Sequence, residues 1–217
     1  TAARFYFPYG VAVDGSGTVF VADTNNHTIR KITSAGVVTT LAGTASSSGT
    51  TDATGASARF NTPYGVTVDG SGNVYVADSF NYTIRKITSA GVVTTLAGLA
   101  GTSGTTDATG SAARFNIPYG VAVYGSGHVY VADRNNHTIR KITSTGDVTT
   151  LAGLAGTSGS ADDIGSVARS NSPYGVAVDA SGTVYATDTI THTLRTINSA
   201  GTVSTLAGMV LGIGSAE

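Results

Sequence analysis

Short segments rich in β-branched and other apolar residues recur in groups of four along the chain, and small polar turns separate them. In the first group the segments cover residues 10–14, 18–23, 28–33 and 37–42. The intervening turns are built from Asp, Asn, Gly, Ser and Thr, which favour tight reversals of the backbone. Because short turns join antiparallel neighbours, each group predicts a four-stranded antiparallel meander.

The groups repeat at a fixed interval of 55 residues. The unit Pro-Tyr-Gly-Val returns at Pro8, Pro63, Pro118 and Pro173. The first two segments of a group are apolar on both faces, whereas the third and fourth mix Thr, Arg and Lys with aliphatic residues. We therefore expect burial to decrease from the first strand to the fourth, as in blades arranged around an axis. On this pattern Val11, Val13, Val19, Val21 and their counterparts form the core.

The period defines the domain organisation. The sequence predicts an all-β fold, a β-propeller built from four 55-residue repeats in a single domain of residues 1–217. The predicted blades cover residues 8–43, 63–98, 118–153 and 173–208, and long Gly/Ser/Thr-rich connectors join them. The connectors have equal length and end on recurring arginines, such as Arg59, so we expect each connector end to be ordered.

Composition narrows the classes of function. Charged residues make up 12% of the chain, against about 25% in an average soluble domain. This Thr- and Ser-rich composition favours an extracellular or cell-surface protein. The net charge of −1 offers no attraction to a phosphate backbone, so we expect no nucleic-acid partner. No apolar run approaches about 18 residues, so we expect no membrane insertion.

The run PYGVAVDGSGTVFVADTNNHTIRKI, with its Asn26-His27 pair, resembles the NHL repeat, and the resemblance covers all four copies. The resemblance implies a β-propeller, most often six-bladed in that family. Four repeats depart from this number. A closed ring of four blades, a ring of eight blades from two chains, and an open arc all remain possible on the sequence alone.

One face of the predicted propeller carries the candidate binding residues. The turn between the second and third strands lies at the same end of a blade as the connector that enters the first strand. Polar and aromatic side chains from both segments therefore share this face, where loops carry binding function. The candidate ligand-binding residues are Asn26, His27, Arg59, Phe60, Asn81, Tyr82, Arg114, Phe115, Asn136, His137, Arg169 and His192.

Three histidines at equivalent positions, His27, His137 and His192, suggest a metal site, and the similar fold of peptidyl-amidating lyases implies zinc binding through histidines. However, zinc requires ligand nitrogens about 2.0–2.1 Å from the ion, and these off-axis turns lie too far apart to converge. We therefore expect no metal site, no cofactor and no catalytic residue. The Asp and Arg sets that recur in every blade, such as Asp23 and Arg30, indicate turn caps and salt bridges.

The sequence predicts a non-enzymatic extracellular or cell-surface scaffold for binding or self-assembly. Its partners would be copies of itself, in a homo-oligomer or filament, and a protein or glycan ligand. The alternative is a metal-dependent lyase or lactonase of the propeller type. RNA binding, as in some NHL proteins, is disfavoured by the charge. A catalytic centre needs unlike groups in unlike roles, whereas this chain repeats the same groups.

Overall fold

The computed structural model describes residues 3–125, 127–210 and 212 of the chain. Within them the chain forms four antiparallel sheets, each of four strands in chain order. The prediction of four-stranded antiparallel blades is confirmed. The first sheet contains β1 (Pro8–Val13), β2 (Val19–Asp23), β3 (Thr28–Ile32) and β4 (Val38–Ala42), and the second contains β5 (Pro63–Val68), β6 (Val74–Asp78), β7 (Thr83–Ile87) and β8 (Val93–Ala97).

The third and fourth sheets repeat this order. They contain β9 (Pro118–Tyr124), β10 (His128–Asp133), β11 (Thr138–Ile142) and β12 (Val148–Ala152), followed by β13 (Pro173–Val178), β14 (Val184–Asp188), β15 (Thr193–Ile197) and β16 (Val203–Ala207). Six short 3₁₀ helices lie in the described turns and connectors: η1 (Thr24–Asn26), η2 (Gly55–Ser57), η3 (Ser79–Asn81), η4 (Gly110–Ala112), η5 (Arg134–Asn136) and η6 (Gly165–Val167).

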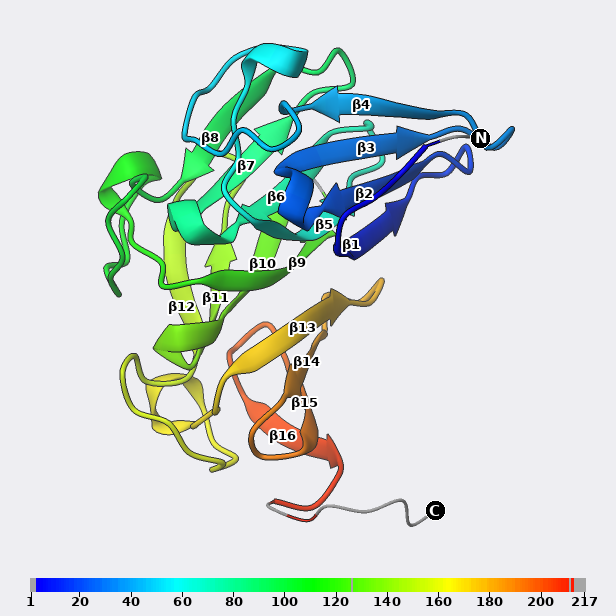
Figure 1. The fold of residues 1–217 in the computed structure, drawn as a ribbon. Coiled ribbons are helices and arrows are strands. Elements are labelled where there is room, and N and C mark those ends of the chain that lie inside the picture. The colour runs from blue at the N-terminus through cyan, green and yellow to red at the C-terminus, as the bar shows by residue number, and fades with distance from the viewer. Residues whose placement is uncertain (1–2, 126, 211, 213–217) are drawn as a thin grey trace.

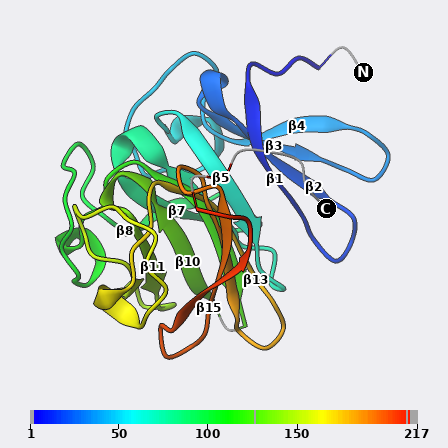
Figure 2. The same cartoon turned by 90° about the horizontal axis from the view of Figure 1, so that it is seen from below.

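The four sheets follow one another along an open arc, from blue to orange in Figure 1. Their first strands lie side by side: β1 packs against β5, β5 against β9, and β9 against β13. The last sheet does not pack along β1 in this way, so the described chain is a row of blades with two free ends. Figure 2 shows the same row of sheets from below.

The expected decrease of burial from the first strand to the fourth is wrong. Burial is greatest in the second strands: every residue of β6 is buried, whereas β5 has four half-buried positions and β8 has an exposed one. The reason is that the first strands line a hollow axis, while the second strands of the two internal blades are covered by the sheets on both sides. The first strands are innermost, as predicted.

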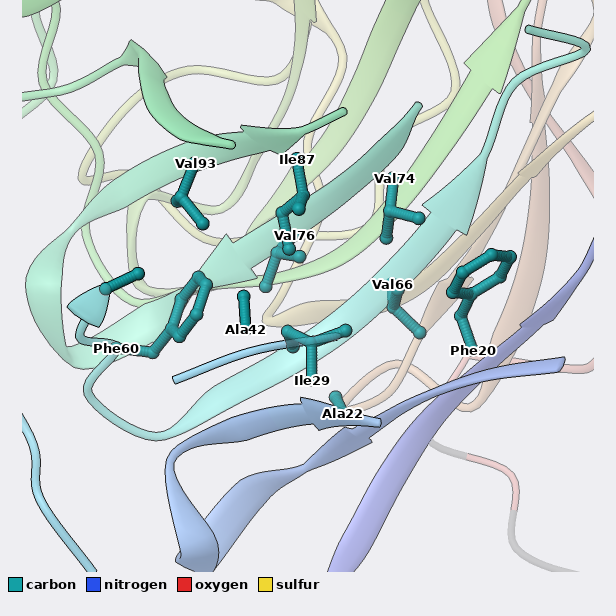
Figure 3. Packing of buried hydrophobic residues seen from close by; sticks show 11 residues of the cluster. Phe20, Ala22, Ile29, Ala42, Phe60, Val66, Val74, Val76, Ile87 and Val93 are labelled. Carbon is teal, nitrogen blue, oxygen red and sulfur yellow. The ribbon is translucent and has the colours of Figure 1, made fainter. Parts of the chain in front are cut away.

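Hydrophobic clusters fill the spaces between successive sheets. In the first cluster Phe20, Ala22 and Ile29 of the first sheet pack against the second sheet, and Figure 3 shows how these side chains interdigitate. The second-sheet residues of this cluster are Val66, Val74, Val76, Ile87 and Val93. Each junction buries aliphatic surface from both blades, and such burial contributes roughly 25 cal/mol per Å². The blades are therefore held mainly by their neighbours.

The core expectation fails at the first blade. Val11 is 67% exposed and Val13 is 62% exposed, whereas Val66, at the position of Val11 in the second blade, is 6% exposed. Within the described residues no blade packs on this side of the first sheet, so side chains that are interior elsewhere in the repeat face solvent here. The same sequence segment is thus core or surface according to its place in the row.

The connectors are hydrogen-bonded segments. In the first connector Gly43 N–H donates to the Gly55 carbonyl at 3.0 Å, and Gly55 N–H donates to the Gly91 carbonyl of the next blade at 2.9 Å. The equivalent bonds recur one period later, from Gly98 to Gly110 and from Gly110 to Gly146. Each connector therefore binds the outer edges of two neighbouring blades together.

Candidate functional site

A β-bulge at the start of each first strand places a tyrosine at the mouth of the axis. In the first blade Pro8 pairs with Asp23 and Val11 with Val21, so Tyr9 and Gly10 together oppose a single residue. The same irregularity recurs at the start of β5, β9 and β13. A bulge re-aims the side chain beside it, and here four tyrosines converge: Tyr9, Tyr64, Tyr119 and Tyr174.

The four rings form a continuous cluster. The rings of Tyr64 and Tyr119 are stacked with their centroids 4.0 Å apart, and the Tyr119 and Tyr174 centroids are 4.1 Å apart. Tyr9 lies edge-on to Tyr64 at 5.1 Å and meets Tyr174 at 6.0 Å. The tyrosine cluster therefore connects the two end blades across the axis, through side chains.

Arg134 adds a cation to the cluster. Its guanidinium carbon lies 5.5 Å from the Tyr119 centroid and 5.7 Å from the Tyr174 centroid, within the range of cation–π attraction. Burial raises the pKa of Tyr9 to about 12 and raises the pKa of Tyr119 as well. Both hydroxyls are therefore protonated near neutral pH and can donate or accept hydrogen bonds. A hollow of about 220 Å³ opens beside the cluster, lined also by the glycines and valines of the first strands.

The asparagines predicted as binding residues hold the connectors. The Asn81 side chain donates to the Gly49 carbonyl at 2.6 Å and to Asp78 Oδ2 at 2.8 Å. Asn136 repeats this pair one period later, with Gly104 and Asp133. Asn26 donates to Asp23 at 2.9 Å. The amide groups of Asn81 and Asn136 are buried in these bonds, so their donors are already used.

The predicted histidines bind the backbone of the following blade. His27 Nδ1 accepts the Thr62 N–H at 3.0 Å, and His137 Nδ1 accepts the Ser172 N–H at 3.1 Å. Burial lowers the pKa of His27 and of His137, and the charge of Arg134 lowers the latter further. Tyr82 occupies this position in the second blade, and His192 occupies it in the fourth blade, which is the last one within the described residues.

The arginines and phenylalanines of the connector ends are also engaged. Arg59 donates to the Ala56 and Ala58 carbonyls at the end of η2, and Arg114 donates to Ser111 and Ala113 in the same way. Arg169 does so at the end of η6. Phe60 and Phe115 are completely buried between blades. These two rings are therefore packing residues and are not available at a surface.

The repeated aspartates and arginines form the ion pairs that the sequence indicated. Arg85 is 1% exposed and donates from Nη1 to Asp78 Oδ2 at 2.7 Å, while its Nη2 pairs with Asp52 of the connector. The Phe60 ring lies 5.1 Å from the Arg85 guanidinium carbon. Burial raises the pKa of Asp78 to about 6, although Arg85 and three hydrogen bonds oppose the shift. Equivalent networks recur at Arg140.

Among the described residues, no three His, Asp or Glu side chains are grouped closely enough to hold a metal ion. The predicted histidines are therefore not brought together. The tyrosine cluster was missed by sequence reasoning, although its signal was present. The Pro-Tyr-Gly-Val unit repeats a tyrosine at the start of the strand predicted to be innermost, so four rings had to meet near the axis.

The NHL repeat model matches residues 5–32 and 115–142. Human NHL repeat-containing protein 2 is 34% identical over 151 residues, which cover 64% of this chain and 21% of that protein. The chain thus spans about a fifth of the length of this curated relative. In the described part of the chain, no helix is long and apolar enough to cross a membrane.

Solved propeller structures share the fold. A streptogramin B lyase matches with a TM-score of 0.67 and 14% identity over 94% of this chain and 56% of that chain. An auxiliary nutrient binding protein from Bacteroides ovatus matches with a TM-score of 0.69 and 19% identity over 95% and 50%. Repeat motif, sequence relatives and blade architecture agree: the chain carries NHL repeats and folds into blades of the β-propeller type.

Proposed function

We propose that the protein is a non-enzymatic scaffold that acts outside the cell or at the cell surface, with a second copy of itself as its main partner. The observation that supports this most strongly is the free face of the first blade. Val11 is 67% exposed there, while Val66 is 6% exposed at the same position of the second blade. Exposed apolar patches of this kind mark interaction surfaces on soluble proteins.

The last blade adds a second free face. Leu206 is 56% exposed and Ala207 is exposed, whereas Ala42, at the position of Ala207 in the first blade, is fully buried. A further blade covers this surface at every internal junction. Burying the two end faces against each other would remove both apolar surfaces from water.

Native mass spectrometry and sedimentation across the micromolar range test the proposal. We expect species at multiples of the chain mass of 21.6 kDa. A single species at the chain mass at every concentration would contradict it.

The proposed location rests on composition. A chain with few charges and many Thr and Ser residues has a composition that favours an extracellular or cell-surface protein. Fractionation of the source cells tests it: the protein should be recovered from the medium or the cell surface. Recovery only from the cell interior would contradict the proposal. With a net charge of −1, we expect no salt-dependent RNA binding.

The tyrosine cluster favours glycan binding as a second role. Stacked rings with hydroxyls offer an apolar platform and hydrogen-bonding groups, which suit a sugar ring. Tyr9, whose ring is about half exposed, borders the hollow at the axis mouth. Screening against a glycan array, with Tyr9→Ala as the matched variant, tests this role. We expect binding by the wild type that the variant loses, and equal signals from both would contradict it.

The alternative function, a metal-dependent lyase or lactonase, requires a group of metal ligands or an asymmetric set of catalytic side chains. The histidines that could supply one are separated into individual blades, where two of them accept backbone hydrogen bonds. The scaffold proposal accordingly assigns no catalytic residue.

A further inference from the structure

We propose that copies of this chain associate head to tail, the last blade of one copy packing against the first blade of the next through the contacts that join its own internal blades. This inference rests on the proposed self-association and specifies its geometry. The head face is the exposed surface of the first sheet around Val11. The tail face is the exposed surface of the last sheet around Gly175, Thr189 and Ala207.

Three internal junctions show the contact that the end faces would make. At each internal junction, the preceding blade contributes an aromatic ring, an alanine and an isoleucine from its second and third strands, as Phe20, Ala22 and Ile29 do. The following blade contributes valines and an isoleucine. The first blade carries the same residue types, Val11, Val19, Val21, Ile32 and Val38, at positions 55 residues before those of the second blade. Val11 is exposed, Val19, Ile32 and Val38 are half-buried, and Val21 is buried.

The two end faces also carry a hydrogen-bond donor and an acceptor at positions that are paired at internal junctions. Thr24 Oγ1 donates to the Pro63 carbonyl of the following blade at 2.7 Å, and Ser79 Oγ donates to the Pro118 carbonyl at 2.5 Å. Both hydroxyl residues are buried by that blade. Thr189 occupies the same position in the last blade and is exposed. Head-to-tail packing places it beside the Pro8 carbonyl of the second copy.

The two end faces also carry the residues that would form the equivalent of the histidine hydrogen bond. His27 and His137 each accept the backbone N–H of a residue with positive φ, Thr62 at 53° and Ser172 at 57°. Phe7 has the equivalent conformation, with φ of 48°. His192 stands at the position of the acceptor in the last blade. In the assembly, His192 would accept the Phe7 N–H of the second copy.

Glycine contacts set how closely the blades approach. A Cβ added at Gly10 would lie 2.4 Å from the Tyr64 carbonyl oxygen of the next blade, and one at Gly120 would lie 2.5 Å from the Tyr174 carbonyl oxygen. At Gly175 the nearest atom is Oγ1 of Thr187, a side chain of the same blade, at 3.2 Å. The tail face therefore keeps the glycine that close packing requires, with no blade yet against it.

These contacts are directional, which excludes a two-fold pairing of like faces. A head face against a head face would bring Val11 beside its own copy and leave the Pro8 carbonyl without a donor. A tail face against a tail face would leave the Thr189 hydroxyl without the Pro8 carbonyl as its acceptor. Each side is complementary to the other and not to itself, so the contact is heterologous.

Two residues of the last blade depart from the pattern: Leu194 replaces the isoleucine of the third strand, and Thr187 replaces the alanine of the second strand. Thr187 stands where the first three blades have buried alanines, Ala22, Ala77 and Ala132. Its hydroxyl accepts the Gly175 N–H at 2.8 Å. The extra side-chain volume should weaken the contact, so Thr187→Ala is expected to tighten the association.

Two copies joined at both ends would make an eight-bladed ring, which lies within the four to eight blades of known propellers. Closure would separate Tyr9 from Tyr174, whose rings are 6.0 Å apart in the single chain. Contact without closure would give a filament. Both products use the same junction.

A mixing experiment with the full chain tests the junction. The head-blocked variant is Val11→Asp, and the tail-blocked variant is Gly175→Ala, with Ala207→Arg as a second tail variant should the first fold poorly. Circular dichroism establishes that each variant folds. By sedimentation we expect each variant alone to be monomeric, and an equimolar mixture to form a 1:1 dimer and nothing larger.

The outcomes separate the two proposals. If the wild type is monomeric at every concentration, the proposed self-association fails, and the head-to-tail geometry fails with it. If the wild type associates but either folded single variant associates equally well, the head-to-tail geometry is overturned while self-association stands. A 1:1 dimer in the mixture alone, together with tighter association of Thr187→Ala, supports the geometry.

Discussion

The Nδ1 atom of His27 accepts a hydrogen bond from the backbone N–H of Thr62 at 3.0 Å, across the junction between the first and second blades. Acceptance at Nδ1 requires a neutral imidazole with its proton on Nε2. A residue that sequence reasoning placed at a binding surface thus holds two blades together. It also makes that junction sensitive to pH.

The histidine bonds predict a pH-dependent loss of stability. Burial lowers the pKa of His27 and of His137, so the folded state prefers the neutral imidazoles. The stabilisation that this preference gives the folded state is present above the unfolded pKa of about 6.5 and is lost as the pH falls below it. We expect the free energy of unfolding to exceed that of the variant His27→Tyr/His137→Tyr at pH 7.5, by a margin that shrinks at pH 5.5.

Asp78 makes the opposite contribution to the pH dependence of stability, because its pKa is raised to about 6. The wild type and the double tyrosine variant share this contribution, so it cancels when the two are compared at each pH. That contribution is present below about 3.8 and is lost as the pH rises through 6. The tyrosine replacements copy the second blade, which has Tyr82 at this position. A margin independent of pH in urea titrations would show that the imidazoles carry no such bond.

A buried charge should distinguish internal blades from the first blade. Val66→Asp places a carboxylate at a 6% exposed site without a partner, and we expect it to cost at least about 3 kcal/mol of unfolding free energy. Val11→Asp makes the same change at a 67% exposed site and should leave the stability of the monomer within about 0.5 kcal/mol. Denaturant unfolding of both variants at low protein concentration measures the difference. Equal losses would mean that Val11 is covered in the monomer.

The buried ion pairs predict a second contrast. Arg85→Met leaves Asp78 buried without its cation and should cost about 3–5 kcal/mol. Arg30→Met should cost less, because the Arg30 side chain is 15% exposed, against 1% for Arg85. Thermal and denaturant unfolding compare the two variants, and a larger loss for Arg30→Met would refute this account of the network.

We predict that purified protein contains no stoichiometric metal and has no lyase or lactonase activity. The reason is that the histidine positions are distributed one to a blade, and that two of them already accept backbone hydrogen bonds. Elemental analysis after dialysis, followed by assays with lactone and ester substrates, measures both properties. Zinc or calcium retained at one equivalent for each chain would favour the enzymatic alternative.

The repeat made the blades predictable from the sequence. Period, turn residues and strand spacing agreed in all four copies, so strand order and antiparallel pairing followed directly. The prediction that failed was the burial of equivalent residues in each copy of the repeat. Val11 and Val66 occupy the same place in the repeat, yet one is surface and the other is core, because exposure depends on whether a blade precedes. A local pattern carries no information about that neighbour.

The candidate site was harder to predict for a related reason. Polar residues such as Asn81 were assigned to binding because they lie in turns, but the connectors fold back over these turns and use their donors. Tyr64 and Tyr119 drew no attention because an apolar strand usually indicates core. Their meeting at the axis depends on a bulge, which a pattern of alternation does not reveal.

The central claim is that an apolar face, exposed in the single chain, is covered by another copy. The chain has no cysteine, so Val11→Cys provides a single thiol on the head face, and Val37→Cys, in an exposed turn, provides a control. Thiol labelling rates are measured from nanomolar to high micromolar protein. The account predicts that labelling at position 11 slows as the concentration rises, while labelling at position 37 does not. Rates at position 11 that stay fast and independent of concentration would contradict it.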